Sequence, residues 1–328
     1  MEKRLNIALL AGGNSSEREI ALQSAAQIYE SLDKERYNIF LIDLNHRDWS
    51  YTATDGTTWQ VDKNDFSITV KGEKTLFDYA LILIHGTPGE DGKLQGYLEM
   101  MEVPFSSCSM TSSVITFDKM TTKRTLEGKV NLAREVFLRR GESYDAAVII
   151  EKLGLPLFVK PNASGSSFGV TRVTQAEQLD EAIRLAFTES AEVLIEECIT
   201  GREMGCGVMV VGGKEYLFPI TEIIAKNDFF DYEAKYTAGM SDEITPADIT
   251  EEVKRELNRM TLEAYRTCRC SGVVRVDFIV TEEGKPYFIE LNSIPGMSGG
   301  SIVPKQAREM GLSLGKLYDL IIEDTYRK

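Results

Sequence analysis

Apolar and polar positions alternate in blocks over the first hundred residues. Short apolar runs predict buried strands, and stretches with apolar residues at helical spacing separate them. We expect strands at LNIALL, YNIFLIDL and LILIHG, the last ending at His85-Gly86, and helices from a Ser15 or Ser16 cap to about Leu32 and over EDGKLQGYLEMM. This order predicts a βαβ-type domain with a largely parallel sheet. The polar segment from Asp48 to Tyr79 carries turn signals between short β-like pieces and has no catalytic interpretation.

The pattern changes after residue 107. A helical run around FDKMTTKRTLE is followed by LGLPLFVKPNASGSSFGVTRV, a helix at AEQLDEAIRLAF and the apolar run VLIEE. The last third predicts the strand pair EMGCGVMVV and KEYLFPI, a helix from Thr250 to Arg266, the pair VVRVDFIV and YFIELN, and two C-terminal helices. We therefore expect an α/β fold, α+β in part, with subdomains at 1–107, 108–196 and 197–328 and a lid loop at about 226–247.

Composition and charge narrow the class of protein. The 328 residues are 43% hydrophobic and carry a net charge of -14, which argues against nucleic-acid and anionic-membrane partners. No apolar run approaches the ~20 residues of a spanning helix. The five scattered cysteines lack metal-site spacing and favour a reducing cytoplasm. A polyanionic ligand would therefore depend on a few local cations and metal ions.

The strand pair VVRVDFIV and YFIELN carries the most informative polar residues. Side chains alternate faces along a strand, so Arg275 and Asp277 share one face, as do Glu290 and Asn292. Carboxylate and amide oxygens suit magnesium, and an arginine beside them suits a phosphoryl group or an oxyanion. A solvated face of alternating charges is the alternative. The apolar opposite face and the backbone-rich loop SIPGMSGG that follows favour a site.

Two further segments indicate nucleotide binding, and a third indicates a lid. Lys160 precedes the small-residue loop PNASGSSFG, whose N–H groups suit phosphate oxygens, and Lys119 offers a second cation; a plain hairpin is the alternative. VLIEE leads to Glu203 and offers backbone groups to adenine, although a structural strand is the better interpretation of this run alone. The aromatic segment FFDYEAKY is typical of a lid or of a decorated surface loop.

The glycine turn LAGGNSSERE after the first strand resembles half of a dinucleotide motif. The third glycine of G-x-G-x-x-G is absent, and Glu17 would repel a pyrophosphate at a helix start. These features argue against a dinucleotide-dependent oxidoreductase. The carboxylate suits a cation such as an ammonium group, although a glutamate favoured by the helix dipole is the commoner case.

These motifs in this order resemble the D-alanine–D-alanine ligase family of the ATP-grasp superfamily. The resemblance covers nearly the whole chain, and HGTPGEDGKLQG, YEAKY and ELNSIPGM are its most specific parts. It implies ATP between the central and C-terminal subdomains, with two magnesium ions (or manganese), D-alanine as substrate and a homodimer. The implied magnesium ligands are Asp277, Glu290 and Asn292, and the implied ATP-binding residues are Lys119, Lys160, Glu196, Glu197, Ile199, Glu203 and Lys235.

The resemblance also implies a two-step reaction through an acyl phosphate of the first D-alanine. Glu17 would face the first amine and link to Ser166 and Tyr236, with His85 near the first carboxylate. Arg275 and the Gly296 N–H would stabilise the oxyanion. The second carboxylate would lie at Ser301 and Ile302, at the start of a helix, which favours an anion.

Two positions depart from commoner members of the family, and two alternatives remain. Glu197 stands where many members have lysine near adenine, and Gly300 where many have a larger polar residue, so a roomier second-substrate pocket is expected. A D-alanine–D-lactate ligase is one alternative, against which Tyr236 argues. A non-catalytic nucleotide-binding protein is the other, against which the three magnesium ligands and three lysines argue.

Overall fold

The computed structural model describes residues 4–165, 168–225 and 241–326. The first part of the chain forms one seven-stranded sheet of order β6-β5-β4-β3-β2-β1-β7. Its elements are β1 (Leu5–Gly12), α1 (Arg18–Ser31), β2 (Tyr37–Asn45), β3 (Asp48–Thr52), β4 (Thr58–Asp62), β5 (Ser67–Val70), β6 (Glu73–Leu76), β7 (Tyr79–Ile82) and α2 (Lys93–Met100). The expected parallel pairing holds for β2, β1 and β7, whereas β3 to β6 extend the sheet with antiparallel strands.

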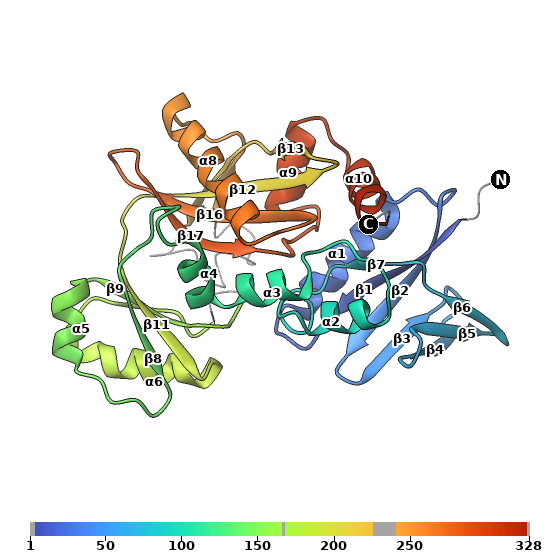
Figure 1. Cartoon of the computed structure of the whole chain (residues 1–328), viewed down its shortest axis with the longest axis horizontal. Coiled ribbons are helices and arrows are strands. Elements are labelled where there is room, and N and C mark those ends of the chain that lie inside the picture. Colours follow the sequence, from blue (N-terminus) through green and yellow to red (C-terminus); the bar gives the residue numbers. More distant parts are fainter. Residues whose placement is uncertain (1–3, 166–167, 226–240, 327–328) are drawn as a thin grey trace.

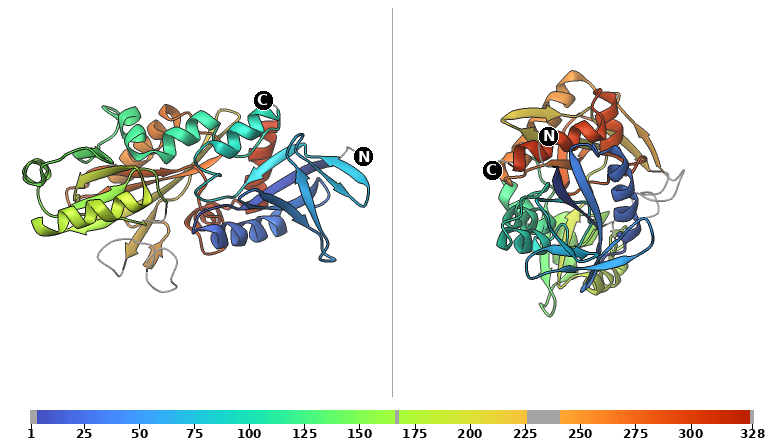
Figure 2. Two further views of the ribbon diagram at one scale, coloured as in Figure 1. Left: turned by 90° about the horizontal axis from the view of Figure 1, so that it is seen from below. Right: turned by 90° about the vertical axis from the view of Figure 1, so that its right-hand side faces the viewer.

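Alternation along β1 explains why this sheet is covered on both faces. Ile7 and Leu9 pack in one core with α1, and Ala8 and Leu10 pack in another with Leu94 of α2. Figure 2 shows α1 on one side of the sheet and α2 on the other. A strand buried on both faces is continuously apolar, as Ile7 to Ala11 of β1 are.

Two local predictions for this domain are wrong. The helix α1 begins at Arg18, and neither serine caps it: Glu17 occupies the N-cap position, while Ser15 donates its hydroxyl to the carbonyl oxygen of His85 at 2.8 Å. The strand β7 ends at Ile82, so His85 lies in the loop beyond it. The serine hydroxyl therefore joins two loops at the ends of parallel strands.

The central part of the chain begins with two helices and continues into a four-stranded sheet of order β10-β9-β11-β8. Its elements are α3 (Met110–Phe117), α4 (Lys119–Leu126), β8 (Glu135–Arg139), α5 (Ala146–Leu153), β9 (Leu157–Pro161), β10 (Thr171–Val173), the 3-10 turn η1 (Ala176–Gln178), α6 (Leu179–Glu189) and β11 (Glu192–Glu197). The expected run FDKMTTKRTLE is divided at Asp118, whose carboxylate caps α4 by accepting the N–H of Thr121 at 2.7 Å.

The C-terminal part forms a sheet of order β15-β14-β12-β16-β17, with β13 also paired to β12. Its elements are β12 (Arg202–Val211), β13 (Lys214–Leu217), β14 (Thr221–Ala225), β15 (Ser241–Ile244), α8 (Glu251–Thr267), β16 (Val273–Val280), β17 (Pro286–Asn292), α9 (Ile302–Glu309) and α10 (Leu314–Tyr326). The strand β15 pairs with β14, so residues 241–244 of the expected lid loop belong to the sheet.

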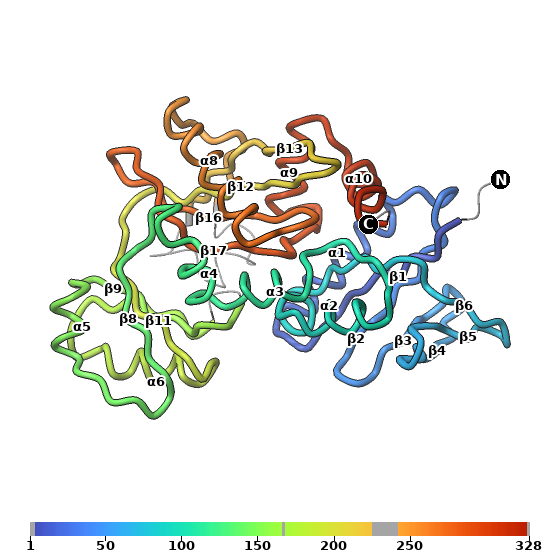
Figure 3. The backbone as a smooth tube through the Cα atoms, in the orientation of Figure 1, coloured from blue at the N-terminus to red at the C-terminus, as the bar shows by residue number. Residues whose placement is uncertain are grey.

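The three parts form an elongated molecule, with the first and central parts at opposite ends (Figure 1). The helix α10 lies beside the first domain (Figure 3). Its residues Leu317 and Ile321 share a core with Leu9 of β1. This shared core attaches the C-terminal sheet to the first domain. No helix in the described ranges is long and apolar enough to cross a membrane.

Candidate active site

Two pockets meet at the centre of the molecule. A pocket of about 300 Å³ lies between the first domain and the C-terminal part, and one of about 490 Å³ lies between the central and C-terminal sheets. Four residues line both pockets: Lys119, Ser164, Gly165 and Glu290. A molecule in the larger pocket can therefore present one end to a molecule in the smaller pocket.

The hairpin of β16 and β17 forms one wall at this junction. The predicted pairing is confirmed, with Arg275 opposite Asn292 and Asp277 opposite Glu290. Arg275 donates to both oxygens of Asp277 at 2.7 and 2.8 Å, and the Asn292 amide donates to Asp277 at 3.0 Å. On the other face, Val274, Val276 and Phe278 are fully buried in the core of the C-terminal part.

The donor set of this wall fits magnesium. Asp277, Glu290 and Asn292 offer two carboxylates and an amide oxygen, which are hard ligands that leave positions for water and phosphate. Among the residues that the structure describes, no group of three or more His, Cys, Asp or Glu side chains is placed to hold a metal ion. Two carboxylates and one amide make up only part of a magnesium coordination sphere, which substrate phosphates and water can complete.

Three charged side chains form a buried network at the wall of the larger pocket, which two of them, Lys160 and Glu196, line. The Glu196 carboxylate pairs with the ammonium groups of Lys160 and Lys123. Burial alone would raise the pKa of Glu196, but the two ammonium groups lower it to about 2. Lys123 is 2% exposed, also pairs with Glu135 at 2.6 Å, and was missed at the sequence level because a lysine on an amphipathic helix is usually solvated.

The remaining predicted nucleotide residues line the same pocket. Glu196, Glu197, Ile199 and Glu203 lie along one wall, and Lys119 donates to the carbonyl oxygen of Ser164 at 2.8 Å. Apolar side chains complete the pocket, among them Phe158, Phe168, Ile223, Ile279 and Phe288. A pocket of this size, lined by apolar side chains together with charged groups, suits a purine nucleotide.

The departure at Glu197 has a structural counterpart. Its carboxylate accepts the backbone N–H of Arg134 at 2.7 Å and pairs with the Arg134 guanidinium at 2.6 Å. This pairing lowers the pKa of Glu197 against the effect of partial burial. The carboxylate is thus tied to the rim of the pocket, where a lysine in other members of the family is implied to face the purine.

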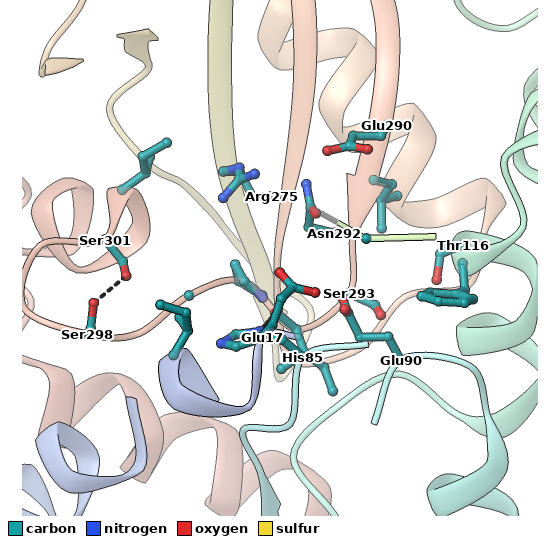
Figure 4. A pocket seen from close by; sticks show the side chains of 18 of the residues that line it. Glu17, His85, Glu90, Thr116, Arg275, Glu290, Asn292, Ser293, Ser298 and Ser301 are labelled. Atoms are coloured by element: carbon teal, nitrogen blue, oxygen red, sulfur yellow. Dashed lines mark hydrogen bonds between the residues drawn. The ribbon is translucent and has the colours of Figure 1, made fainter. Parts of the chain in front are cut away.

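The smaller pocket has polar and charged side chains on two facing sides, one from the first domain and one from the β16–β17 hairpin (Figure 4). Glu17, His85 and Glu90 come from the first domain, and Arg275, Glu290 and Asn292 from the hairpin. A Cβ added to Gly165 would lie 2.6 Å from the Glu17 carboxylate, so glycine permits the close approach of the central loop. The pocket thus combines parts of all three regions of the chain.

Residues from the start of α9 line the other end of the smaller pocket. Ser301 occupies the N-cap position of α9, and its hydroxyl is hydrogen-bonded to that of Ser298 at 2.8 Å. Ile302 and Gly296 line the pocket beside it. A Cβ added to Gly300 would meet nothing within 4 Å, which agrees with a roomy pocket at this position.

The His85 ring has a defined tautomer. Its Nδ1 is 2.9 Å from the carbonyl oxygen of Ile294 and must therefore donate, which leaves Nε2 as an acceptor. Nε2 is buried without a hydrogen-bond partner among the described residues. Burial lowers the pKa of His85, which the Glu17 carboxylate opposes. A neutral imidazole with an unsatisfied acceptor is suited to a donor group on a substrate.

Three predicted site residues lie outside the described part of the chain, and one residue that lines the smaller pocket was not predicted from the sequence. Ser166, Lys235 and Tyr236 lie outside the described residues, as does most of the expected lid, so their roles remain predictions. Glu90, within the GEDG motif, lines the smaller pocket although no role was predicted for it. Burial and the nearby Glu17 carboxylate raise the pKa of Glu90 above its ordinary value.

A nucleotide-sized pocket between two antiparallel sheets, with a carboxylate-bearing hairpin at its inner end, defines an enzyme of the ATP-grasp class. Sequence models described as D-ala D-ala ligase N-terminus and C-terminus match residues 6–108 and 130–323. The D-alanine--D-alanine ligase of Bacteroides fragilis (strain YCH46) is 44% identical over 322 residues, covering 98% of this chain and 99% of the relative. The chain belongs to the D-alanine–D-alanine ligase family.

Solved structures agree with this assignment. The VanG D-Ala:D-Ser ligase from Enterococcus faecalis superposes with a TM-score of 0.89 at 31% identity, covering 99% of this chain and 100% of that one. The D-alanine--D-alanine ligase from Bacillus anthracis complexed with ATP has a TM-score of 0.80 at 32% identity, covering 99% and 98%. The fold is therefore shared over the whole chain.

Proposed function

We propose that this protein joins two D-alanine molecules into D-alanyl-D-alanine, with conversion of ATP to ADP and phosphate, for peptidoglycan precursor synthesis. The observation that carries the proposal is the meeting of two pockets at Lys119, Ser164, Gly165 and Glu290. One pocket suits a purine nucleotide, and the other, which combines carboxylates, an arginine and a helix start, suits amino acids.

In the first step, the larger pocket holds ATP with its phosphates toward the junction. Lys119 and Lys160 provide positive charge, and Glu196, Glu197, Ile199 and Glu203 line the adenosine end. Magnesium bound at Asp277, Glu290 and Asn292 would supply neutralisation of the phosphate charge. Glu17 binds the ammonium of the first D-alanine, whose carboxylate oxygen attacks the γ-phosphorus; the new O–P bond gives an acyl phosphate as ADP leaves.

In the second step, the amine of another D-alanine attacks the acyl carbon. The C–N bond forms, the amine loses a proton, and cleavage of the C–O bond releases phosphate. Arg275 and the Gly296 N–H are proposed to stabilise the intermediate oxyanion, and the start of α9 at Ser301 and Ile302 to hold the second carboxylate. Exclusion of water protects the acyl phosphate from hydrolysis.

The central test measures the release of phosphate from ATP in the presence of magnesium. D-Alanine is expected to stimulate release and to yield the dipeptide, whereas L-alanine is not. A further reaction with D-alanine plus D-lactate distinguishes a depsipeptide ligase, which would form an ester product. The absence of any D-alanine-dependent phosphate release would refute the proposed function and would favour a non-catalytic nucleotide-binding protein.

A second prediction concerns Tyr236, in the proposed lid. In Tyr236→Phe, loss of the hydroxyl is expected to loosen lid closure by removing its link to Ser166 and Glu17, so water reaches the acyl phosphate. The ratio of phosphate released to dipeptide formed should rise above the value of one that the proposed reaction predicts for the native enzyme. A ratio that stays at one would contradict this role.

The same proposal includes subdomain boundaries near residues 107 and 197, a homodimeric assembly and a cytoplasmic location. They rest on the sequence and on the family resemblance. Light scattering of the purified protein during turnover tests the dimer directly.

A further inference from the structure

Two side chains of one loop lie against the backbone of one residue in another part of the protein. The His85 Nδ1–H donates to the carbonyl oxygen of Ile294 at 2.9 Å, and the Glu90 carboxylate lies near the N–H of the same residue. His85 and Glu90 follow β7 of the first domain, whereas Ile294 follows β17 of the C-terminal sheet. We call these two side chains, together with the backbone N–H and carbonyl group of Ile294, the Ile294 clamp.

The loop that carries the clamp is rigidly built. Glu90 and Gly86 exchange two hydrogen bonds: the Glu90 N–H donates to the Gly86 carbonyl oxygen at 2.8 Å, and the Gly86 N–H donates to the Glu90 carboxylate at 2.7 Å. A Cβ at Gly89 would lie 2.1 Å from the carbonyl oxygen of Ile84, and the buried Gln95 amide donates to the Gly89 carbonyl oxygen. The position of Glu90 is therefore determined before any substrate binds.

The clamped peptide lies between two groups of the proposed reaction centre. Asn292, a proposed magnesium ligand on the β16–β17 hairpin, precedes Ile294 by two residues, and Gly296 follows it by two. Glu17, on the first domain, is near His85 and Glu90 in the same pocket (Figure 4). The clamp therefore sets the position of the loop that carries Gly296, the proposed oxyanion donor, relative to the first domain, which is proposed to bind the first substrate. Misplacement by about 1 Å in such an arrangement costs on the order of a hundredfold in rate.

We propose that Glu90 is a positioning residue for the ligation reaction: by fixing Gly86 and the adjacent His85 against the Ile294 backbone, it aligns Gly296 with the substrate bound at Glu17. This inference rests on the proposed function. Glu90 acts through the backbone of another segment, so its removal should lower the rate of the chemical steps more than the binding of ATP, whose adenosine end lies in the other pocket.

The test compares Glu90→Gln and Glu90→Ala with Asp91→Asn. Asp91 is the neighbouring acid, pairs with Lys93, and does not line either pocket. We expect kcat for dipeptide formation to fall about a hundredfold in Glu90→Ala. Glu90→Gln, whose amide oxygen still accepts one N–H, should restore part of that loss, and the KM for ATP should change less than threefold in both. Asp91→Asn should retain the native kcat.

Two outcomes would overturn the inference. A native kcat in Glu90→Ala would show that the clamp does not align the site. A loss of kcat that merely follows the fraction of folded protein, measured by circular dichroism at the assay temperature, would show a structural role only. The native enzyme is assayed first: if it shows no D-alanine-dependent phosphate release, the proposed function fails, whereas failure of the clamp alone leaves the native enzyme active and appears as one of these two outcomes in Glu90→Ala.

Discussion

Glu290→Gln is expected to abolish measurable ATP-dependent turnover while the protein remains folded. The side chain lines both pockets, opposite Asp277 on the paired strand, where the proposed magnesium ion would contact the phosphates. Replacing a carboxylate ligand by a neutral amide weakens the binding of magnesium. The negative charge that develops on the phosphates in the transition state is then stabilised less. A loss of several kcal/mol corresponds to a decrease in kcat on the order of a thousandfold.

The matched control is Glu282→Gln in the turn between the same two strands. Glu282 is exposed and lines neither pocket, so this variant should keep the native kcat. Both variants should unfold at nearly the native temperature, because neither change opens a cavity in the core. Turnover of Glu290→Gln above about a tenth of the native rate would contradict the assignment of Glu290 as a magnesium ligand.

The parts of the site that follow strand periodicity were predictable from the sequence. The alternation in VVRVDFIV and YFIELN placed Arg275, Asp277, Glu290 and Asn292 on one wall, and the pairing of β16 with β17 confirms that these residues meet. A two-residue period needs no knowledge of the rest of the chain. The apolar runs of the first sheet were recognised for the same reason.

The parts that depend on contacts between distant segments were not predictable. In the sequence GEDG, Glu90 has the pattern of a solvated acid. In the structure, the loop after β17 places the Ile294 backbone beside it. The buried state of Lys123, on helix α4, depends on Glu196, which lies on β11 of the central sheet. Ser15 was expected to cap a helix, but its hydroxyl donates instead to the His85 carbonyl oxygen of a neighbouring loop. In each case a long-range partner outweighs the local pattern.

The network around Glu196 leads to the second large prediction, which concerns stability. Glu196→Gln keeps the shape of the side chain but leaves the buried Lys160 without its carboxylate and Lys123 with Glu135 alone. Removing one partner of a buried ion pair typically costs about 3 kcal/mol or more. Against a total of roughly 5–15 kcal/mol, this is a large fraction of the free energy of unfolding.

The adjacent residue supplies the control. Glu197→Gln removes a charge at the next position, but its partner Arg134 is 60% exposed, so the pair is screened by water. The free energy of unfolding should fall by no more than about 1 kcal/mol. Urea unfolding of both variants beside the native protein compares a buried with a partly exposed carboxylate on one strand. Equal losses in the two variants would show that the Glu196 network adds no special stability.

The same network predicts how the difference depends on pH. The pKa of Glu196 is about 2 in the folded protein and 4.5 for an unperturbed glutamate, so its charged form stabilises the fold. This contribution is fully present above about pH 4.5 and is lost as the pH falls toward 2. The gap in unfolding free energy between the native protein and Glu196→Gln should therefore be constant near neutral pH and shrink in acid. A gap that persists unchanged at pH 2.5, about the folded pKa, would mean that the lost stability comes from packing rather than charge.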